Sequence, residues 1–283
     1  MGNDATLELE RMTWPDVRAA LDAGRTTVVF ACGAVEQHGP HLPLFTDAEH
    51  GSELSRRVAR ELGDALVAPT VRVGCSEHHM AFPGTISLEE STFAAVLRDY
   101  VRSLARHGFR RICVIPSHGG NFAPLTRALP SLREAAGERV HVAAFTDLQA
   151  VIGAWVRLAG ELGLAERVGG HADIAESSVM LALHPELVRT EVVETGHVGP
   201  LTPELIQRLF TQGMRAISPN GILGDAHGSP RSSGSAASRS SWRSSSPTSG
   251  GKSRKNPSLG KLTAACALRR RRRTSRRRSL RHP

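Results

Sequence analysis

The segment that decides the fold runs from Thr26 to Asp47 and reads TTVVFACGAVEQHGPHLPLFTD. Its first part, Thr26 to Cys32, is an uninterrupted run of apolar and β-branched residues, the pattern of a strand buried on both faces of a sheet. Polar residues follow soon after, among them Glu36 and His38. In open α/β sheets, functional residues gather at the carboxyl ends of the strands. We therefore expect a buried strand that leads into a functional loop.

Strand-like and helix-like segments alternate along the first 228 residues. Further strands are predicted at Leu66–Val73, Arg111–Pro116 and Val140–Phe145. Helices are predicted from Pro15 to Gly24 and at Ala48–Leu62, Ser87–His107, Phe122–Ala136, Leu148–Leu162 and Ile174–Leu183. The Ser87–Glu90 sequence SLEE fits a capping box that opens its helix. Strands alternating with helices predict an α/β fold with a mostly parallel sheet, covered by helices on both faces.

The charge of the chain divides it into two parts. The 283 residues carry a formal net charge of +9, but residues 229–283 hold 16 of the 36 basic residues and none of the 27 acidic ones, which leaves −7 for residues 1–228. The first part is long enough to bury one large core. The second is rich in Ser and Arg and poor in large apolar residues, so we expect it to be disordered. The predicted organisation is a folded domain over 1–228 and a basic tail over 229–283.

Three interpretations of the basic tail stay open. An acid-free stretch rich in Arg, Ser and Pro is what a GC-rich gene read out of frame tends to encode, so the tail could be a frameshifted C-terminus. It could equally be a disordered accessory segment. Sixteen positive charges could also bind nucleic acid through counterion release, although the tail has one aromatic residue and no folded recognition motif. A nucleic-acid partner is therefore the least favoured of the three interpretations.

Several function classes are excluded by composition. No apolar run approaches the roughly 18 residues that a membrane span needs. The N-terminus lacks the basic and apolar regions of a secretory signal. The four cysteines contain no CxxC pair, which argues against a disulfide scaffold and for a reducing compartment. We expect a cytoplasmic protein that does not associate with membranes.

The first loop offers a set of metal ligands. Glu36 and His38 are two residues apart, so at an extended strand end they project to the same side. The turn formed by Gly39, Pro40 and Pro43 could bring Asp47 back to them. One imidazole and two carboxylates suit Zn²⁺, Mn²⁺ or Fe²⁺. The same residues could instead form a polar loop network without a metal.

Two later segments contribute further candidates. His118 follows a predicted buried strand in the Gly-rich turn SHGGN, where glycines let the backbone approach closely and aim the side chain at the strand ends. The alternative is a surface histidine in a flexible turn. His171 and Glu176 lie at the start of the predicted helix Ile174–Leu183 and could instead belong to a capped helix with a polar first turn. The cluster Glu77, His78 and His79 fits a loop that rims the same site or a second metal site.

Together these segments resemble the creatininase family of metal-dependent amidohydrolases. The matching motifs are EQHGPHLPLxTD at 36–47, FPGTI at 82–86, HGGN at 118–121, GHAxxxESSxML at 170–181 and SPNGILGD at 218–225. The resemblance implies a three-layer α/β/α sandwich and a binuclear metal centre of Zn and/or Mn, with Fe as a further option. It also implies a homo-oligomer, a hexamer in the family.

The resemblance also implies a role for each matching residue. Glu36 and His118 hold one metal, His38 holds the other, and Asp47 bridges the two. His171 matches the catalytic histidine beside the substrate. Creatinine-hydrolysing members add a glutamate where this chain has Gly120. Without that glutamate, the second metal is either held by Glu176 or bound weakly. If Glu176 is not a ligand, it could orient or deprotonate the attacking water.

The expected function is hydrolysis of an amide-type C–N bond in a small molecule by a metal-bridging hydroxide. His171 would give a proton to the departing nitrogen. Arg167 stands where creatinine-specific enzymes carry a tryptophan, which argues against creatinine itself. The leading specific alternative is a mycofactocin-type precursor peptidase, because that relative shares the HGGN form of the turn. The alternative from another class is a non-catalytic or nucleic-acid-associated protein that acts through its basic tail.

Overall fold

A four-stranded parallel sheet forms the centre of the molecule, in a computed structural model that describes residues 7–228. Its strand order is β2–β1–β3–β4. The strands are β1 (Thr27–Cys32), β2 (Ala65–Val67), β3 (Arg111–Pro116) and β4 (His141–Ala144). All three pairings are parallel. β1 is central and all six of its residues are buried, which confirms the prediction made from its apolar run.

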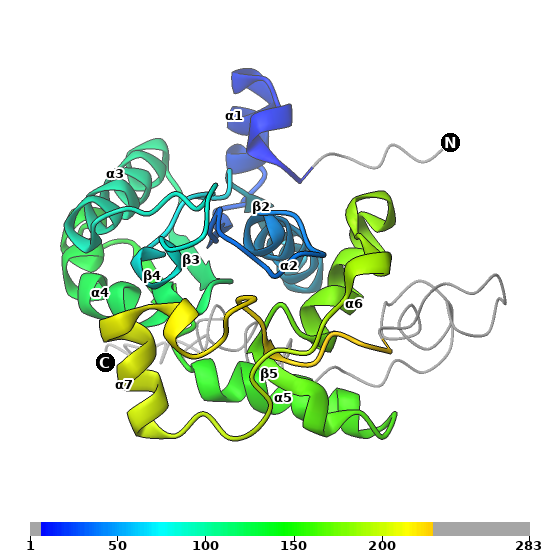
Figure 1. Ribbon diagram of the computed structural model, residues 1–283. Coiled ribbons are helices and arrows are strands. Elements are labelled where there is room, and N and C mark those ends of the chain that lie inside the picture. The colour runs from blue at the N-terminus through cyan, green and yellow to red at the C-terminus, as the bar shows by residue number, and fades with distance from the viewer. Residues whose placement is uncertain (1–6, 229–283) are drawn as a thin grey trace, which may run out of the picture.

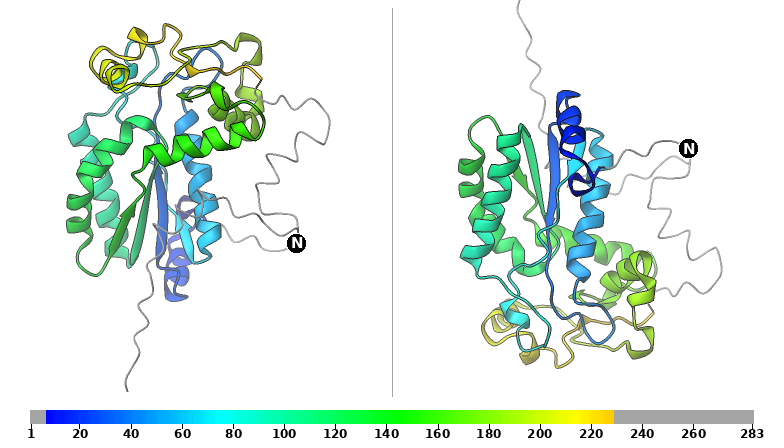
Figure 2. Two further views of the ribbon diagram at one scale, coloured as in Figure 1. Left: turned by 90° about the horizontal axis from the view of Figure 1, so that it is seen from below. Right: turned by 90° about the horizontal axis from the view of Figure 1, so that it is seen from above.

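Helices cover both faces of the sheet and complete a three-layer α/β/α sandwich (Figures 1 and 2). Helix α2 (Thr46–Leu62) packs on one face, while α3 (Glu90–His107) and α4 (Phe122–Ala136) pack together on the other. The larger hydrophobic core lies on the α3–α4 side and contains Phe30 and Phe93, both fully buried. A smaller core joins β1 and β3 to α2. The predicted fold class is therefore confirmed.

A cap of shorter elements lies at the end of the sheet where the strands finish (Figure 2, left). It contains α5 (Leu148–Gly160), β5 (Val168–His171), α6 (Ile174–Leu183), α7 (Pro203–Gln212) and β6 (Leu223–Gly224), with β5 and β6 paired antiparallel. Helix α1 (Trp14–Asp22) lies at the opposite end of the sheet. Short 3-10 turns complete the described chain, at Leu9–Arg11, Glu77–His79, Gly119–Asn121, Ala165–Arg167, Pro185–Leu187, Thr190–Val192 and Met214–Ala216.

Two local predictions are wrong. The capping box is not formed: α3 begins after Glu89, and the Ser87 hydroxyl accepts a hydrogen bond from the Ser76 amide at 2.9 Å instead. The second strand ends at Val67 rather than Val73, because Pro69 has no N–H to continue the ladder. Strands β5 and β6 and helix α7 were not predicted.

Within residues 7–228, no helix is both long enough and apolar enough to cross a membrane. Cys32 and Cys113 are buried in the strands, as expected for small apolar side chains. The predicted disorder of the basic tail, and its alternative interpretations, concern residues 229–283, which lie outside the described residues.

Candidate metal centre

The loop after β1 delivers two of the predicted ligands to the interior. An isolated β-bridge joins Val35 to Ile86, and a second one joins His38 to Leu42. These bridges fix the backbone on both sides of Glu36, so that the side chains of Glu36 and His38 are both completely buried. Buried ionisable groups need charged or polar partners, and here those partners come from other segments.

Helix α2 and the end of β3 supply the next two candidates. Asp47 lies in the first turn of α2, where the positive end of the helix dipole favours a carboxylate. His118 lies two residues after the end of β3. Its Nδ1 atom lies 3.2 Å from Glu36 Oε1 and 3.2 Å from Asp47 Oδ2. The rigid turn between His38 and Asp47 does bring this aspartate back to the first loop, since His38 Nε2 lies 3.5 Å from Asp47 Oδ1.

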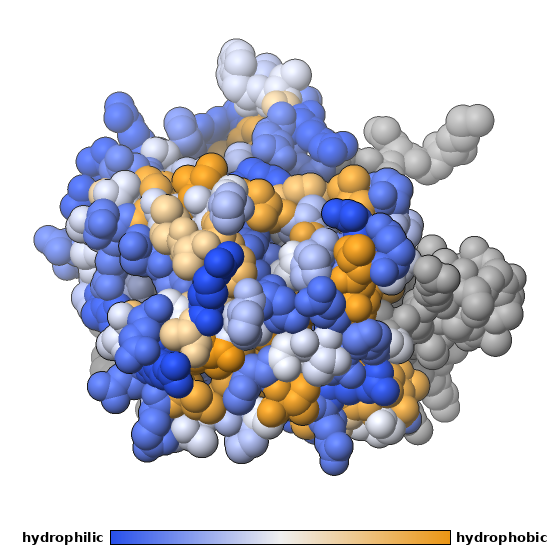
Figure 3. Space-filling model, viewed as in Figure 1, coloured by the Kyte–Doolittle hydropathy of each residue, from blue (hydrophilic) through white to orange (hydrophobic). Residues whose placement is uncertain are grey.

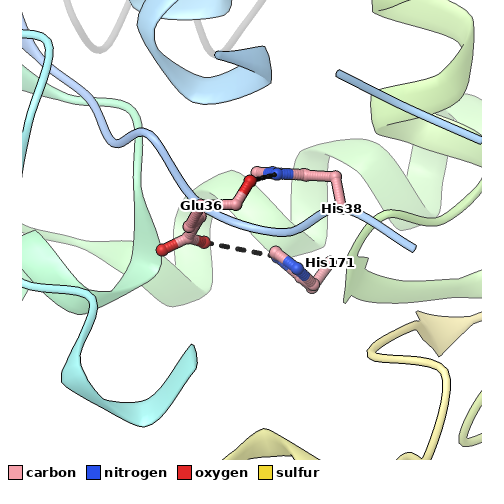
Figure 4. A group of neighbouring side chains, drawn as sticks. All are labelled: Glu36, His38 and His171. Atoms are coloured by element: carbon pink, nitrogen blue, oxygen red, sulfur yellow. Dashed lines mark hydrogen bonds and ion pairs between the residues drawn. The ribbon is translucent and has the colours of Figure 1, made fainter. Parts of the chain in front are cut away.

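The cap contributes Glu176 and His171. Glu176 lies in the first turn of α6, and its Oε2 atom lies 3.5 Å from His38 Nε2 and accepts a hydrogen bond from the Ala172 amide at 2.6 Å. His171 ends β5, and its Nδ1 faces Glu36 Oε1 at 3.7 Å (Figure 4). Asp173, the N-cap of α6, accepts four backbone N–H groups and so holds this corner in place. The structure thus brings all six predicted site residues into one cluster.

The three candidate histidines share one hydrogen-bond arrangement. In each ring one nitrogen faces a backbone carbonyl oxygen: His38 Nδ1 faces Glu36 O at 3.1 Å, His118 Nε2 faces Cys75 O at 3.0 Å, and His171 Nε2 faces Gln37 O at 2.9 Å. A carbonyl can only accept, so each of these nitrogens carries the hydrogen. When such a ring is neutral, as it is on binding a metal, its other nitrogen points an unshared electron pair into the cluster.

Several buried polar atoms of the cluster have no hydrogen-bond partner. They are Glu36 Oε1, Glu36 Oε2, His38 Nε2 and Asp47 Oδ2. Groups of this kind are rare in folded proteins, because an unsatisfied buried polar atom costs free energy. The cluster contains three sets of ligand atoms that lie within 4.8 Å of one another, namely Glu36/Asp47/His118, His38/Asp47/Glu176 and Glu36/His38/His171. These carboxylate and imidazole donors fit divalent Zn, Mn or Fe.

The electrostatics of the cluster favour positive charge at its centre. Burial opposes a charge on His38, but the carboxylates of Asp47 and Glu176 outweigh it and raise the pKa of His38 to about 10. The pKa of His118 is likewise raised well above its ordinary value, since Glu36 and Asp47 outweigh its burial. Burial raises the pKa of Glu176 to about 8. In the absence of a metal, protons would therefore occupy the region in which cations fit.

At Gly120 the resemblance noted above implies a glutamate in creatinine-hydrolysing enzymes, but this structure has no room for a side chain there. A Cβ atom at Gly120 would lie 2.3 Å from Cys75 O and 2.4 Å from His118 Nε2. These two atoms form the hydrogen bond that orients His118. A side chain at residue 120 would therefore break that bond, and Glu176 is the acidic side chain that approaches His38 instead.

Sequence reasoning did not predict every residue that contacts the cluster. The loop carrying His78 and His79 was expected either to rim the same site or to form a second metal site. It lies against the cluster: His79 Nε2 is 3.5 Å from Glu36 Oε1, and His78 stacks on His118. Gln37 was not singled out, although its side-chain nitrogen contacts both His79 and His171. Only its place between Glu36 and His38 could have drawn attention to it.

Apolar side chains lie exposed on the segments that surround the cluster. Phe210 of α7 is 57% exposed and contacts the His78 ring at 4.8 Å between centroids. Met80 and Ile86, on the loop that pairs with the Glu36 segment, are about half exposed. The face of the molecule seen in Figure 3 accordingly shows apolar patches within a polar surface. Such a rim could bind an apolar group next to the reacting bond.

Comparison with known proteins gives a consistent result. The family model described as "Creatininase: Creatinine amidohydrolase" matches residues 10–241. A mycofactocin precursor peptide peptidase from Mycolicibacterium smegmatis is 34% identical over 203 residues, which cover 70% of this chain and 74% of that protein. A creatinine amidohydrolase from Pseudomonas putida is 29% identical, over 62% of this chain and 72% of that protein. A solved creatininase mutant of Zn–Zn type superposes with a TM-score of 0.63 at 25% identity, covering 93% of this chain and 95% of its own.

Proposed function

The chain belongs to the creatininase family of amide-bond hydrolases, and we propose that it cleaves the C–N bond of a small-molecule amide with two divalent cations bound at the Glu36 cluster. One observation carries this proposal. Four buried polar atoms from Glu36, His38 and Asp47 converge without hydrogen-bond partners, and cations would satisfy all of them.

The arrangement of donors suggests how two cations would share the residues. Glu36, Asp47 and His118 would hold one, and His38, Asp47 and Glu176 would hold the other, so that Asp47 bridges the pair. When bound, such cations polarise a carbonyl oxygen and lower the pKa of a water molecule toward neutrality. A Zn–Zn form of a related creatininase supports this assignment of metal type and number.

His171 is suited to move the proton. Its Nε2 hydrogen is held by Gln37 O, so Nδ1 is the atom left free to accept a proton inside the site. Burial and the neighbouring His38 lower the pKa of His171 well below its ordinary value. A proton taken up there is therefore readily given to the departing nitrogen. Glu176 is also placed to orient the attacking water, or to take a proton from it if it is not a metal ligand.

A second candidate function is trimming of a precursor peptide. Two observations favour it: the 34% identity to the mycofactocin precursor peptidase, and the exposed apolar side chains of Phe210, Met80 and Ile86 around the cluster. An apolar rim suits a peptide with large side chains better than a small polar amide. In both cases the same cluster would act on the bond.

Elemental analysis of the purified protein tests the proposal. About two equivalents of Zn, Mn or Fe per chain are expected, with less metal in Glu36→Gln and His118→Ala proteins. Glu134→Gln, the same chemical change at an exposed position on α4, should leave the metal content unchanged. A screen of creatinine, other small amides and peptides with apolar C-termini would identify a compound that the protein hydrolyses. Chelation should then abolish hydrolysis of that compound. A protein that takes up no metal after reconstitution would refute the proposal.

A further inference from the structure

The side-chain amide of Gln37 has a fixed orientation. Its Oε1 atom accepts a hydrogen bond from the Gly39 amide at 2.9 Å, and its Nε2 atom donates one to Gly221 O at 3.0 Å. A flipped amide would place oxygen against the Gly221 carbonyl and nitrogen against the Gly39 N–H, losing both bonds. The nitrogen of Gln37 therefore points toward the cluster, and one of its two hydrogens is already engaged.

The second amide hydrogen has two neighbours. Gln37 Nε2 lies 2.8 Å from His79 Nδ1 and 3.0 Å from His171 Nε2. His171 Nε2 also faces the backbone oxygen of Gln37, which can only accept, so this nitrogen carries a hydrogen and cannot accept another. The amide hydrogen therefore goes to His79 Nδ1. With this assignment, Gln37 Nε2, His79 Nδ1 and His171 Nε2 each have a hydrogen-bond partner.

The assignment selects the tautomer of His79. A neutral ring that accepts at Nδ1 carries its hydrogen at Nε2, and this atom faces Glu36 Oε1 at 3.5 Å. Because Nδ1 accepts the Gln37 hydrogen, only Nε2 carries a hydrogen and the ring is neutral. His79 is almost completely buried, so water does not compete for this N–H.

The late motif around Gly221 supports the same arrangement. Gly221 has a φ of +80°, and a Cβ atom there would lie 2.1 Å from Gln37 Oε1. The absence of a side chain therefore lets the Gly221 carbonyl reach the Gln37 amide. This contact gives the SPNGILGD segment a role in the site, although it supplies no predicted ligand.

We propose that Gln37 and His79 are positioning residues: the Gln37 amide holds His79 in the tautomer whose Nε2 hydrogen faces Glu36 Oε1, and this electrostatic contact, longer than a normal hydrogen bond, holds the Glu36 carboxylate toward the metal. The inference rests on the proposed metal centre. It predicts that the two residues act through Glu36 on metal affinity and touch neither the metal nor the substrate.

Substitutions at the two positions separate hydrogen bonding from shape. Gln37→Met keeps the approximate volume and removes the donor, and His79→Phe removes both ring nitrogens. His79→Gln can accept from Gln37 through its oxygen and donate to Glu36 through its nitrogen. Gln207→Met makes the first change at an exposed position on α7 and is the matched control. The measurements are Mn²⁺ affinity by titration and the ring-nitrogen protonation of His79 by magic-angle-spinning NMR of ¹⁵N-histidine-labelled, metal-free protein.

Gln37→Met and His79→Phe are expected to weaken Mn²⁺ binding by about 10- to 100-fold, the usual effect of removing a hydrogen-bond partner of a metal ligand. His79→Gln should restore affinity close to that of the unmodified protein, and Gln207→Met should match it. The spectra should show the His79 hydrogen on Nε2, shifting partly to Nδ1 in Gln37→Met. Unchanged affinity in Gln37→Met, or a His79 hydrogen on Nδ1 in the unmodified protein, would overturn the inference. Unmodified protein that binds no Mn²⁺ would instead refute the proposed function, and the spectra alone would then decide the role of Gln37.

Discussion

Removal of the metal should destabilise the folded protein by an amount that the cluster allows us to estimate. Four buried polar atoms of Glu36, His38 and Asp47 have no hydrogen-bond partner. Each such atom costs about 1–3 kcal/mol, so the metal-free cluster carries a penalty of about 4–12 kcal/mol. Protonation of His38 and His118 relieves part of it at neutral pH, because their pKa values are raised. We therefore expect the metal-free protein to be destabilised by the lower end of this range, about 4 kcal/mol.

This penalty should be visible in thermal unfolding. For a domain of this size, 1 kcal/mol shifts Tm by about 2–4 °C, so chelation should lower Tm by roughly 8–16 °C. Differential scanning calorimetry with and without a chelator, followed by Mn²⁺ or Zn²⁺ addition, measures the shift and its reversal. An unchanged Tm after complete metal removal would refute the argument from unsatisfied atoms.

The substitution Glu176→Gln should stabilise the metal-free protein, whereas removal of the metal destabilises the unmodified protein. Burial raises the pKa of Glu176 to about 8, so its charged form is unfavourable in the metal-free protein. The side-chain oxygen of a glutamine can keep the bond from the Ala172 amide and also face the Nε2 hydrogen of His38, which stays protonated up to about pH 10. Above about pH 8, metal-free Glu176→Gln should unfold at a higher temperature than the metal-free unmodified protein, yet gain less from metal. Glu134→Gln, on the exposed surface of α4, should change neither value.

Three further predictions concern pH, catalysis and assembly. The pKa of His38 is raised to about 10 in the metal-free fold, so its stabilising contribution is complete below about pH 6.5 and is lost as the pH rises toward 10. The metal-induced rise in Tm should therefore be larger at about pH 9 than at about pH 7, and a constant shift would contradict this. His171→Ala should lower kcat by about 10²–10⁴-fold, while elemental analysis should still find both metals. Helix α5 is rich in apolar residues, yet only Ala154 and Ala159 are buried, which is expected if a second copy of the chain covers it. Light scattering should show an oligomer that Val151→Glu weakens, and a monomeric unmodified protein would rule this out.

The sequence was sufficient where a single residue type or a long pattern carries the structure. β1 and β3 were predictable because strands buried on both faces are continuous apolar runs. The candidate ligands were identifiable because Glu36, His38 and His118 are polar residues in the loops that follow such strands. Elements stabilised by tertiary contacts were not predictable. β5 contains Gly169 and Gly170, which local propensity does not mark as a strand.

The role of Gln37 could not be obtained from the sequence for a different reason. Its contacts join the β1 loop to the His79 turn, the end of β5 and the Gly221 segment, 42 to 184 residues away along the chain. A glutamine in a loop has no pattern that reveals such partners. The hydrogen bonds of the buried amide become evident only when all of its neighbours are placed together.

The use of backbone carbonyls to orient the three candidate histidines affects how this site can evolve. The carbonyls of Glu36, Gln37 and Cys75 belong to the main chain, and no codon change can delete them. A mutational scan should therefore find few sensitive side chains among those that surround the three histidine rings. Substitutions should be tolerated least at Gly120 and Gly221, where an added carbon atom would collide with the groups that orient the site. The exposed rim is free of this constraint, so substrate preference can drift while the chemistry beneath it is inherited unchanged.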